Sequence, residues 1–244
     1  MVRPLWSVAV RGTLRFLLGY PRPGLMAAPG APASVRRDRV WYAGWVKAVL
    51  HLPRRTTYAD YLAAEHRSER RHEFIDGVIV AMAVGSDEHN AIAFRFSMLF
   101  GMRMPDGCRG YTSDQRFWIA ATTRGRYSDG SIICGKPVHP AHDGQATVNP
   151  LVVVEVLSPS SEGDDDGEKR RDFQSLASLQ AYVITAQDER SVKVYRRSER
   201  GEWRDAPDVY RAGDSFELPR LTRAIAVDEI YDGIVDSAGR SLLK

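Results

Sequence analysis

Two acidic side chains fall on neighbouring apolar segments of this sequence. Asp129 lies near the start of the strand-like run Ser128–Cys134. Glu155 interrupts a second apolar run, Leu151–Leu157, and the two runs are joined by the loop Gly135–Asn149. If the runs pair as an antiparallel unit, the loop centre and the midpoint of the two acids both fall at position 142. The acids are then expected to face each other with Cβ atoms about 5 Å apart, and they repel unless a positive charge lies between them.

Glu155 is the more unusual of the two acids. Its surroundings are apolar on both faces, which predicts a central strand that is buried on both sides. Burying an unpaired carboxylate there costs several kcal/mol. A divalent cation with oxygen ligands would remove this cost, and so would a buried salt bridge to one of the 29 arginines. Residue spacing alone leaves both interpretations open.

Lys169 adds a cation to this region. In the predicted helix Gly167–Leu179 it shares one face with Phe173 and Leu176, at spacings of four and seven residues. That face is expected to pack on the sheet, so the ammonium is predicted to point inward. A lysine there can orient an attacking water and stabilise a pentacoordinate phosphate. The alternative is that the side chain snorkels along the helix surface.

Three further groups could contribute. Glu73 precedes an Asp-Gly turn and is a candidate for a further metal or water ligand, or an exposed strand residue. His89 falls on the apolar face of a predicted helix, which favours a satisfied core histidine over a catalytic one. The acidic run Glu162–Asp166 is predicted to be a solvated, helix-capping loop rather than a calcium site.

The elements that position these residues follow from periodicity and turn signals. Thr57 followed by Asp60 predicts a helix that runs to about Arg70, and Ser86 or Asp87 predicts the start of a second. The apolar positions of the second helix fall on one face: Ile92, Ala93, Phe96, Leu99 and Phe100. A hairpin is expected over Glu73–Ile79, and a final helical turn over Val227–Tyr231. Further strands are expected at Gln115–Ala120, Tyr182–Thr185, Val192–Tyr195 and Ser215–Leu218. This order predicts an α+β or mixed α/β fold.

Charge divides the chain unevenly. Residues 1–57 carry ten basic side chains and one acid, leaving 24 basic and 30 acidic groups in the rest. We expect residues 1–55 to be a basic extension, solvated or in contact with a polyanion, residues 56–234 to be the main domain, and residues 235–244 to be a tail.

The apolar stretch Leu5–Tyr20 contains two arginines and is too short to span a membrane. Cys108 and Cys134 are too few for a disulfide framework, so a reducing cytoplasm is the expected location.

Several of these motifs, in this order, resemble the Uma2 family of restriction-endonuclease-like proteins, a branch of the PD-(D/E)XK nuclease superfamily. The resemblance covers about residues 56–234, and the run Val154–Ser160 carries most of it. The other matching segments are Glu73–Gly77, Ser86 with His89, Ser113–Asp114, Ser128–Asp129, Gly167–Lys169, Ser178–Gln180 and Val192–Arg196.

The resemblance implies a mixed sheet flanked by helices and a role for each acidic residue. Asp129 and Glu155 would hold Mg²⁺ or Mn²⁺, Glu73 would complete the metal shell, and Lys169 would assist the hydrolysis of a DNA phosphodiester. The chain departs from the superfamily pattern at Leu157, where a lysine is expected, so that role must either pass to Lys169 or be lost.

Other departures are Ser128, Gly130, Phe173 and Ala181, which stand where the family often has proline, a β-branched residue, tyrosine and glutamate. The alternative function is therefore a catalytically inactive nuclease-fold protein that binds nucleic acid or a protein partner. A homodimer would suit an enzyme that cuts both DNA strands.

Overall fold

The apolar run around Glu155 forms strand β8 (Val152–Leu157), and all six of its residues are buried. Successive side chains of a strand point to opposite faces of the sheet. Val154 and Val156 accordingly join one hydrophobic core, whereas Val153 and Leu157 join another. The prediction of a central strand buried on both sides is confirmed, and the alternation places Glu155 on the face of Val153 and Leu157.

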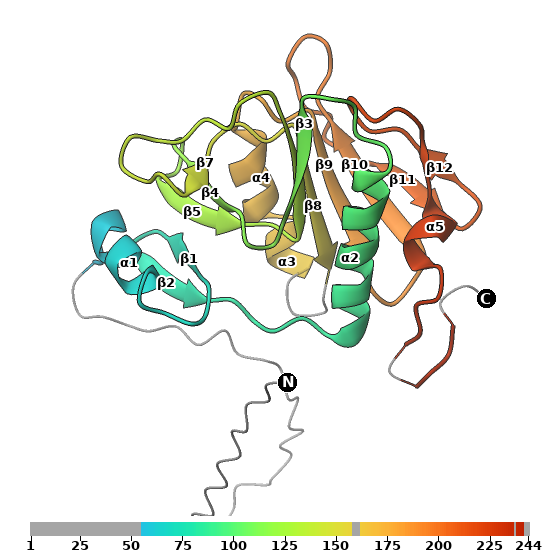
Figure 1. Cartoon of the computed structure of the whole chain (residues 1–244), viewed down its shortest axis with the longest axis horizontal. Helices are drawn as coiled ribbons and strands as arrows, with labels where there is room; N and C mark the ends of the chain where they lie inside the picture. Colours follow the sequence, from blue (N-terminus) through green and yellow to red (C-terminus); the bar gives the residue numbers. More distant parts are fainter. Residues whose placement is uncertain (1–54, 158–161, 237, 242–244) are drawn as a thin grey trace, which may run out of the picture. The chain divides into compact units, whose positions relative to one another are not determined.

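β8 lies inside a six-stranded mixed sheet with the order β11-β10-β9-β8-β6-β3 (Figure 1). Its other strands are β3 (Cys108–Thr112), β6 (Gly130–Cys134), β9 (Ala181–Ala186), β10 (Ser191–Arg196) and β11 (Asp208–Arg211). β8 pairs antiparallel with β6 and parallel with β9. The parallel pair requires a crossover connection, which contains α3 (Glu162–Asp165) and α4 (Glu168–Gln174).

A five-stranded sheet with the order β2-β1-β5-β4-β7 continues from the first. Its strands are β1 (His72–Ile75), β2 (Val78–Ala81), β4 (Arg116–Ile119), β5 (Arg124–Tyr127) and β7 (Ala146–Thr147). The predicted hairpin is confirmed, because Asp76 and Gly77 take the positive φ angles of 52° and 81° that a tight turn between β1 and β2 needs. Only Ser128 and Asp129 separate β5 from β6, so Asp129 lies where the two sheets join.

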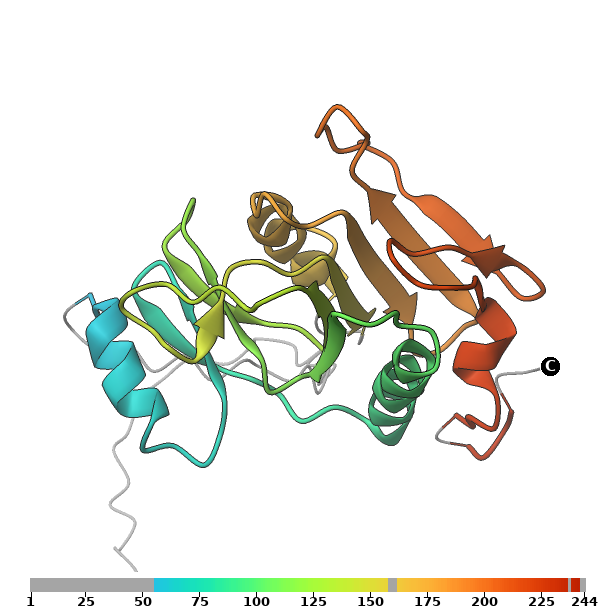
Figure 2. The ribbon, with the colours of Figure 1, turned by 45° about the horizontal axis from the view of Figure 1, so that its top comes forward.

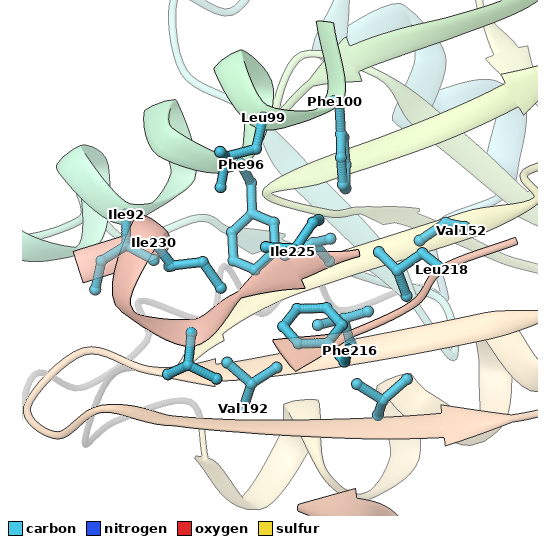
Figure 3. Packing of buried hydrophobic residues seen from close by; sticks show 14 of the residues in the cluster. Ile92, Phe96, Leu99, Phe100, Val152, Val192, Phe216, Leu218, Ile225 and Ile230 are labelled. Carbon is cyan, nitrogen blue, oxygen red and sulfur yellow. The ribbon is translucent and has the colours of Figure 1, made fainter. Parts of the chain in front are cut away.

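The helices cover opposite faces of the six-stranded sheet. On one face, α2 (Asp87–Gly101) packs with α5 (Val227–Tyr231) and the short pair β12 (Ser215–Phe216) and β13 (Ile225–Ala226). Figure 3 shows Ile92 of α2 beside Ile230 of α5, and Phe96 of α2 directed toward Ile225 of β13. On the other face, Phe173 of α4 packs in the core that contains Val153 and Leu157. Figure 2 shows α2, in green, and α4, in tan, on either side of the sheet.

The sequence predicted the first residues of the helices more accurately than their last residues. Thr57 caps α1 (Tyr58–Glu65) in a capping box with Asp60, and Ser86 caps α2, as predicted. However, α1 ends at Glu65 rather than near Arg70, and α4 ends at Gln174 rather than Leu179. The last-turn prediction for α5 is confirmed. The predicted α+β class, with a mixed sheet flanked by helices, is therefore confirmed.

Cys108 and Cys134 face each other on β3 and β6 and form a disulfide. The sequence did not anticipate this bond, because 26 residues separate the two cysteines and only strand pairing brings them together. The cysteines therefore no longer support the expectation of a reducing compartment. Among the residues that the structure describes, no helix is both long and apolar enough to cross a bilayer.

The computed structural model describes residues 55–157, 162–236 and 238–241, all within the unit Ala43–Lys244. Nearly all of the expected basic extension, residues 1–55, lies outside the described residues, and so do the last three residues of the tail. Ser158, Pro159 and Ser160, which end the strongest matching motif, are also outside them. The proposed domain boundaries thus stay predictions.

Candidate active site

Asp129 is fixed between the two sheets by hydrogen bonds to β8. Its N–H donates to the Val154 carbonyl at 3.1 Å, and its Oδ2 accepts the Val156 N–H at 2.7 Å. β6 and β8 pair Gly130 with Val154, which is the register that the loop midpoint predicted. The ladder ends at that pair, and the Asp129 N–H donates to the Val154 carbonyl. The direct facing of Asp129 and Glu155 thus stays a prediction. The Asp129 side chain keeps 14% of its surface exposed, which leaves it accessible to a small ligand.

Glu155 is almost completely enclosed, with 2% of its side chain exposed. Its Oε2 accepts a hydrogen bond from Lys169 Nζ at 2.8 Å. Its Oε1 is buried and has no hydrogen-bond partner among the described residues. One oxygen of this carboxylate is thus paired. The other has lost its hydrating water without gaining a hydrogen bond from the described residues, which is unfavourable for the free energy of folding.

Lys169 points inward from α4, as predicted, and does not snorkel along the surface. Besides Glu155, its ammonium lies 3.3 Å from Asp165 Oδ1 and 4.0 Å from Glu73 Oε1. The cation that meets Glu155 is this lysine, and not the arginine that the salt-bridge interpretation expected. Lys169 therefore forms the centre of a group of three carboxylates.

Glu73 is buried on β1 rather than exposed. Its Oε1 accepts the Tyr127 N–H at 3.1 Å, and its Oε2 accepts an Arg126 N–H at 3.0 Å. Arg126 is fully buried and also pairs with Asp172 of α4. This arginine links β1, β5 and α4 around Glu73, and sequence analysis missed it because the β5 segment Arg-Gly-Arg-Tyr has no apolar alternation.

His89 and Asp165 are the two site residues that sequence analysis misplaced. His89 Nε2 lies 3.0 Å from Asp129 Oδ1, with 17% of the histidine side chain exposed. It is therefore a partner of the candidate ligand, although the helical pattern favoured a core residue. Asp165 is buried against Lys169, whereas its acidic run was predicted to be a solvated loop. For His89, the signal was the motif that pairs it with Ser86, whose hydroxyl accepts the His89 N–H.

The carboxylates of Glu155 and Asp129 have pKa shifts of opposite sign. Burial raises the pKa of Glu155 well above its usual value, against the charge of Lys169. Burial also acts on Asp129, but the hydrogen bond and charge of His89, together with Lys169, outweigh it and lower the pKa of Asp129. For Lys169, the charges of Glu155, Asp165 and Glu73 outweigh burial and raise the pKa well above its usual value. Opposed shifts in one small cluster are typical of functional sites.

The donor set fits a hard divalent cation held by two protein carboxylates. Among the described residues, no three His, Cys, Asp or Glu side chains are arranged to hold a metal on their own. Mg²⁺, however, usually binds through one or two carboxylates and completes its shell with waters and substrate phosphates. Glu155 Oε1 is a buried acceptor without a partner among the residues that the structure describes, and each Asp129 oxygen has a spare lone pair beside the one hydrogen bond it makes with them.

Comparison with known proteins agrees with the earlier resemblance. A crystal structure from Anabaena variabilis, described as a putative nuclease belonging to DUF820, superposes with a TM-score of 0.56 at 16% identity and covers 72% of this chain and 97% of its own. At that identity the likeness concerns the fold. An uncharacterized protein of Synechocystis sp. is 34% identical over 176 residues, which make up 72% of this chain and 90% of the relative.

A second uncharacterized Synechocystis protein is 32% identical over 150 residues, covering 60% of this chain and 84% of the relative. Residues 58–228 match the model of the Uma2 family, whose description is "Putative restriction endonuclease". With most of the described residues inside that match, the chain belongs to the Uma2 family.

Proposed function

We propose that this protein is a metal-dependent endonuclease that hydrolyses DNA phosphodiester bonds. The observation that carries the proposal is the buried Oε1 of Glu155, which has no partner in the described structure. Asp129 hydrogen-bonds to Val154 and Val156, the two neighbours of Glu155 on β8. A structural salt bridge alone would leave this oxygen desolvated at a cost of about 1–3 kcal/mol. A divalent cation would satisfy it and offset the repulsion between the two acids.

Asp129 and Glu155 would hold the cation, Mg²⁺ or Mn²⁺. When bound, it would supply a Lewis acid that lowers the pKa of a water and offsets charge on phosphate oxygens. Asp129 is prepared for this role, because the Val156 N–H and His89 hold its carboxylate in one orientation. Both partners are donors and leave lone pairs for a ligand.

Lys169 and Glu73 would act beside the two ligands. The ammonium of Lys169 can orient the attacking water and stabilise negative charge on the pentacoordinate phosphorus. Both Glu73 oxygens already accept hydrogen bonds from Tyr127 and Arg126, so we place Glu73 in the outer metal shell, through a water. In the reaction, the water oxygen bonds to phosphorus, one phosphorus–oxygen ester bond breaks, and the proton that the water releases passes to the departing oxygen.

The basic residues 1–57 are the segment best suited by charge to contact the DNA polyanion. A homodimer would bring two such sites to the two strands of a duplex. A cytoplasmic location stays the expectation for an enzyme that acts on DNA.

Cleavage of plasmid and linear DNA by the full chain tests the proposal. We expect cleavage with Mg²⁺ or Mn²⁺ and none with excess chelator. Glu155→Gln and Asp129→Asn should each lower the rate at least about 100-fold, because each removes a ligand, without lowering the melting temperature markedly. Glu168→Gln is the matched control, since this half-exposed carboxylate of α4 lies next to Lys169 in sequence and pairs with Arg124 at 2.9 Å and more loosely with Arg126 at 3.8 Å instead. Full activity in Glu155→Gln would refute the proposal. An inactive chain that binds no Mn²⁺ through Asp129 would favour the non-catalytic alternative.

A further inference from the structure

Asp165 brings a buried carboxylate to the centre of the site from the short helix α3. Its Oδ1 lies 3.3 Å from Lys169 Nζ, one helical turn away in sequence. The side chain is buried, and the Tyr182 hydroxyl of β9 donates to the Asp165 backbone carbonyl at 3.0 Å. This bond connects the backbone of Asp165 to β9 and so restricts where its carboxylate can lie.

The position of the Lys169 ammonium requires such an anchor. A lysine head is a compact charge on a flexible four-carbon stem, and ordering it costs about 2 kcal/mol of rotamer entropy. Glu155 alone supplies one short contact, at 2.8 Å, while Glu73 stands 4.0 Å away with both oxygens engaged elsewhere. With Glu155 as its only close partner, the ammonium could swing around that one oxygen. Asp165 adds a second close contact and restricts this motion.

The neighbouring acid has a different role. Asp166 Oδ2 accepts a hydrogen bond from Lys193 Nζ at 2.8 Å, and its Oδ1 accepts one from the Tyr195 hydroxyl at 2.6 Å. Both partners lie on β10. Two consecutive carboxylates therefore diverge, one toward the candidate active site and one toward β10.

We propose that Asp165 is a positioning residue that holds the Lys169 ammonium beside Glu155 for phosphodiester hydrolysis. The inference rests on the proposed nuclease function for its effect on the rate, while the contact itself can be measured independently. Loss of the Asp165 charge leaves Lys169 with one close carboxylate, so the ammonium becomes mobile and exchanges its protons faster. Turnover then falls because the ammonium no longer meets the transition state in one geometry.

The test compares Asp165→Asn and Asp165→Glu with Asp166→Asn as the matched control. The chain has only five lysines, so the ¹⁵N-lysine spectrum of the ammonium groups is simple, and Lys169→Met assigns the signal. We expect a protected Lys169 ammonium signal in the unmutated chain and in Asp166→Asn. The signal should disappear or exchange much faster in Asp165→Asn and return in part in Asp165→Glu.

Kinetics provide the second measurement. Asp165→Asn should lower kcat about 10–100-fold, the usual range for a residue that orients a group at a metal site, with little change in KM for DNA. Asp165→Glu should recover part of kcat. An Asp165→Asn variant with the Lys169 signal and the kcat of Asp166→Asn overturns the inference. If the chain proves inactive on DNA but the Lys169 signal depends on Asp165, the contact stands and the nuclease proposal alone fails.

Discussion

The Lys169 ammonium donates to Glu155 Oε2 at 2.8 Å, while Oε1 of the same carboxylate is buried without a partner in the described part of the chain. Glu155 therefore divides its oxygens between a protein cation and a buried acceptor position. Lys169 and a bound divalent cation would share one carboxylate, and their charges would repel each other.

The first prediction concerns the use of the Glu155 carboxylate by both Lys169 and a divalent cation. Lys169→Met should bind Mn²⁺ about tenfold more tightly than the unmutated chain, because it removes a positive charge next to Glu155, while it loses most of its DNA cleavage. Titration calorimetry measures the affinity, and a cleavage assay measures the rate. Lys193→Met is the control, since that lysine lies on β10 and pairs with Asp166 rather than Glu155. Weaker Mn²⁺ binding in Lys169→Met than in the control would contradict the shared use of Glu155.

The second prediction concerns His89. His89→Gln should weaken Mn²⁺ binding about 10–100-fold, because partners that orient a ligand contribute in that range. The hydrogen bond to Asp129 at 3.0 Å is the contact that is lost or weakened. His66→Gln, at an exposed histidine after α1, should leave the affinity unchanged. Equal affinities in both variants would remove His89 from the site.

The third prediction concerns pH. The pKa of Glu155 is raised by burial, so this carboxylate takes up a proton as the pH falls at values where an ordinary glutamate is still ionised. The pKa of Asp129 is lowered, so Asp129 stays ionised over the same range. At subsaturating Mg²⁺, the acid limb of the pH profile of kcat/KM should therefore lie above the usual glutamate value of about 4.3. Calorimetry should show that the Mn²⁺ affinity falls over the same pH range as kcat/KM. A flat profile down to that value would be inconsistent with this role for Glu155.

The fourth prediction concerns stability away from the site. Burial opposes ionisation of Asp143, but hydrogen bonds from Arg116, Tyr58 and the Gln145 N–H outweigh it and lower its pKa to about 2. Because the folded-state pKa is below the unfolded one of about 3.9, the contribution to stability is complete above the unfolded value. It is lost as the pH falls toward 2, and it amounts to about 2 kcal/mol.

Urea unfolding of the unmutated chain and Asp143→Asn at pH 7 and at pH 2 measures this contribution. The variant should be less stable at pH 7, and the difference in the free energy of unfolding should shrink at pH 2. A difference of the same size at both pH values would mean that the charge of Asp143 is not its cause.

The sequence predicted the parts of the site that depend on local pattern and strand symmetry. The register of β6 and β8, with Gly130 opposite Val154, followed from the loop midpoint, and the inward direction of Lys169 followed from its helical face. Thr57 and Ser86 marked helix starts because capping is a local interaction.

The contacts that the sequence could not predict are long-range. Asp165 looked solvated because its neighbours in sequence are acidic, and only the packing of α3 against β8 buries it. His89 lies 40 residues from Asp129, so the pairing depends on where α2 meets the sheet. Arg126 and the disulfide between Cys108 and Cys134 likewise depend on which strands become neighbours.

Crystals soaked in Mn²⁺ test the central claim most directly, through the anomalous signal of the metal. The account predicts a peak about 2.1 Å from Glu155 Oε1 and from one oxygen of Asp129, a distance typical of a hard cation with oxygen ligands. Mn²⁺ bound elsewhere on the protein, with Glu155 joined only to Lys169, would contradict it.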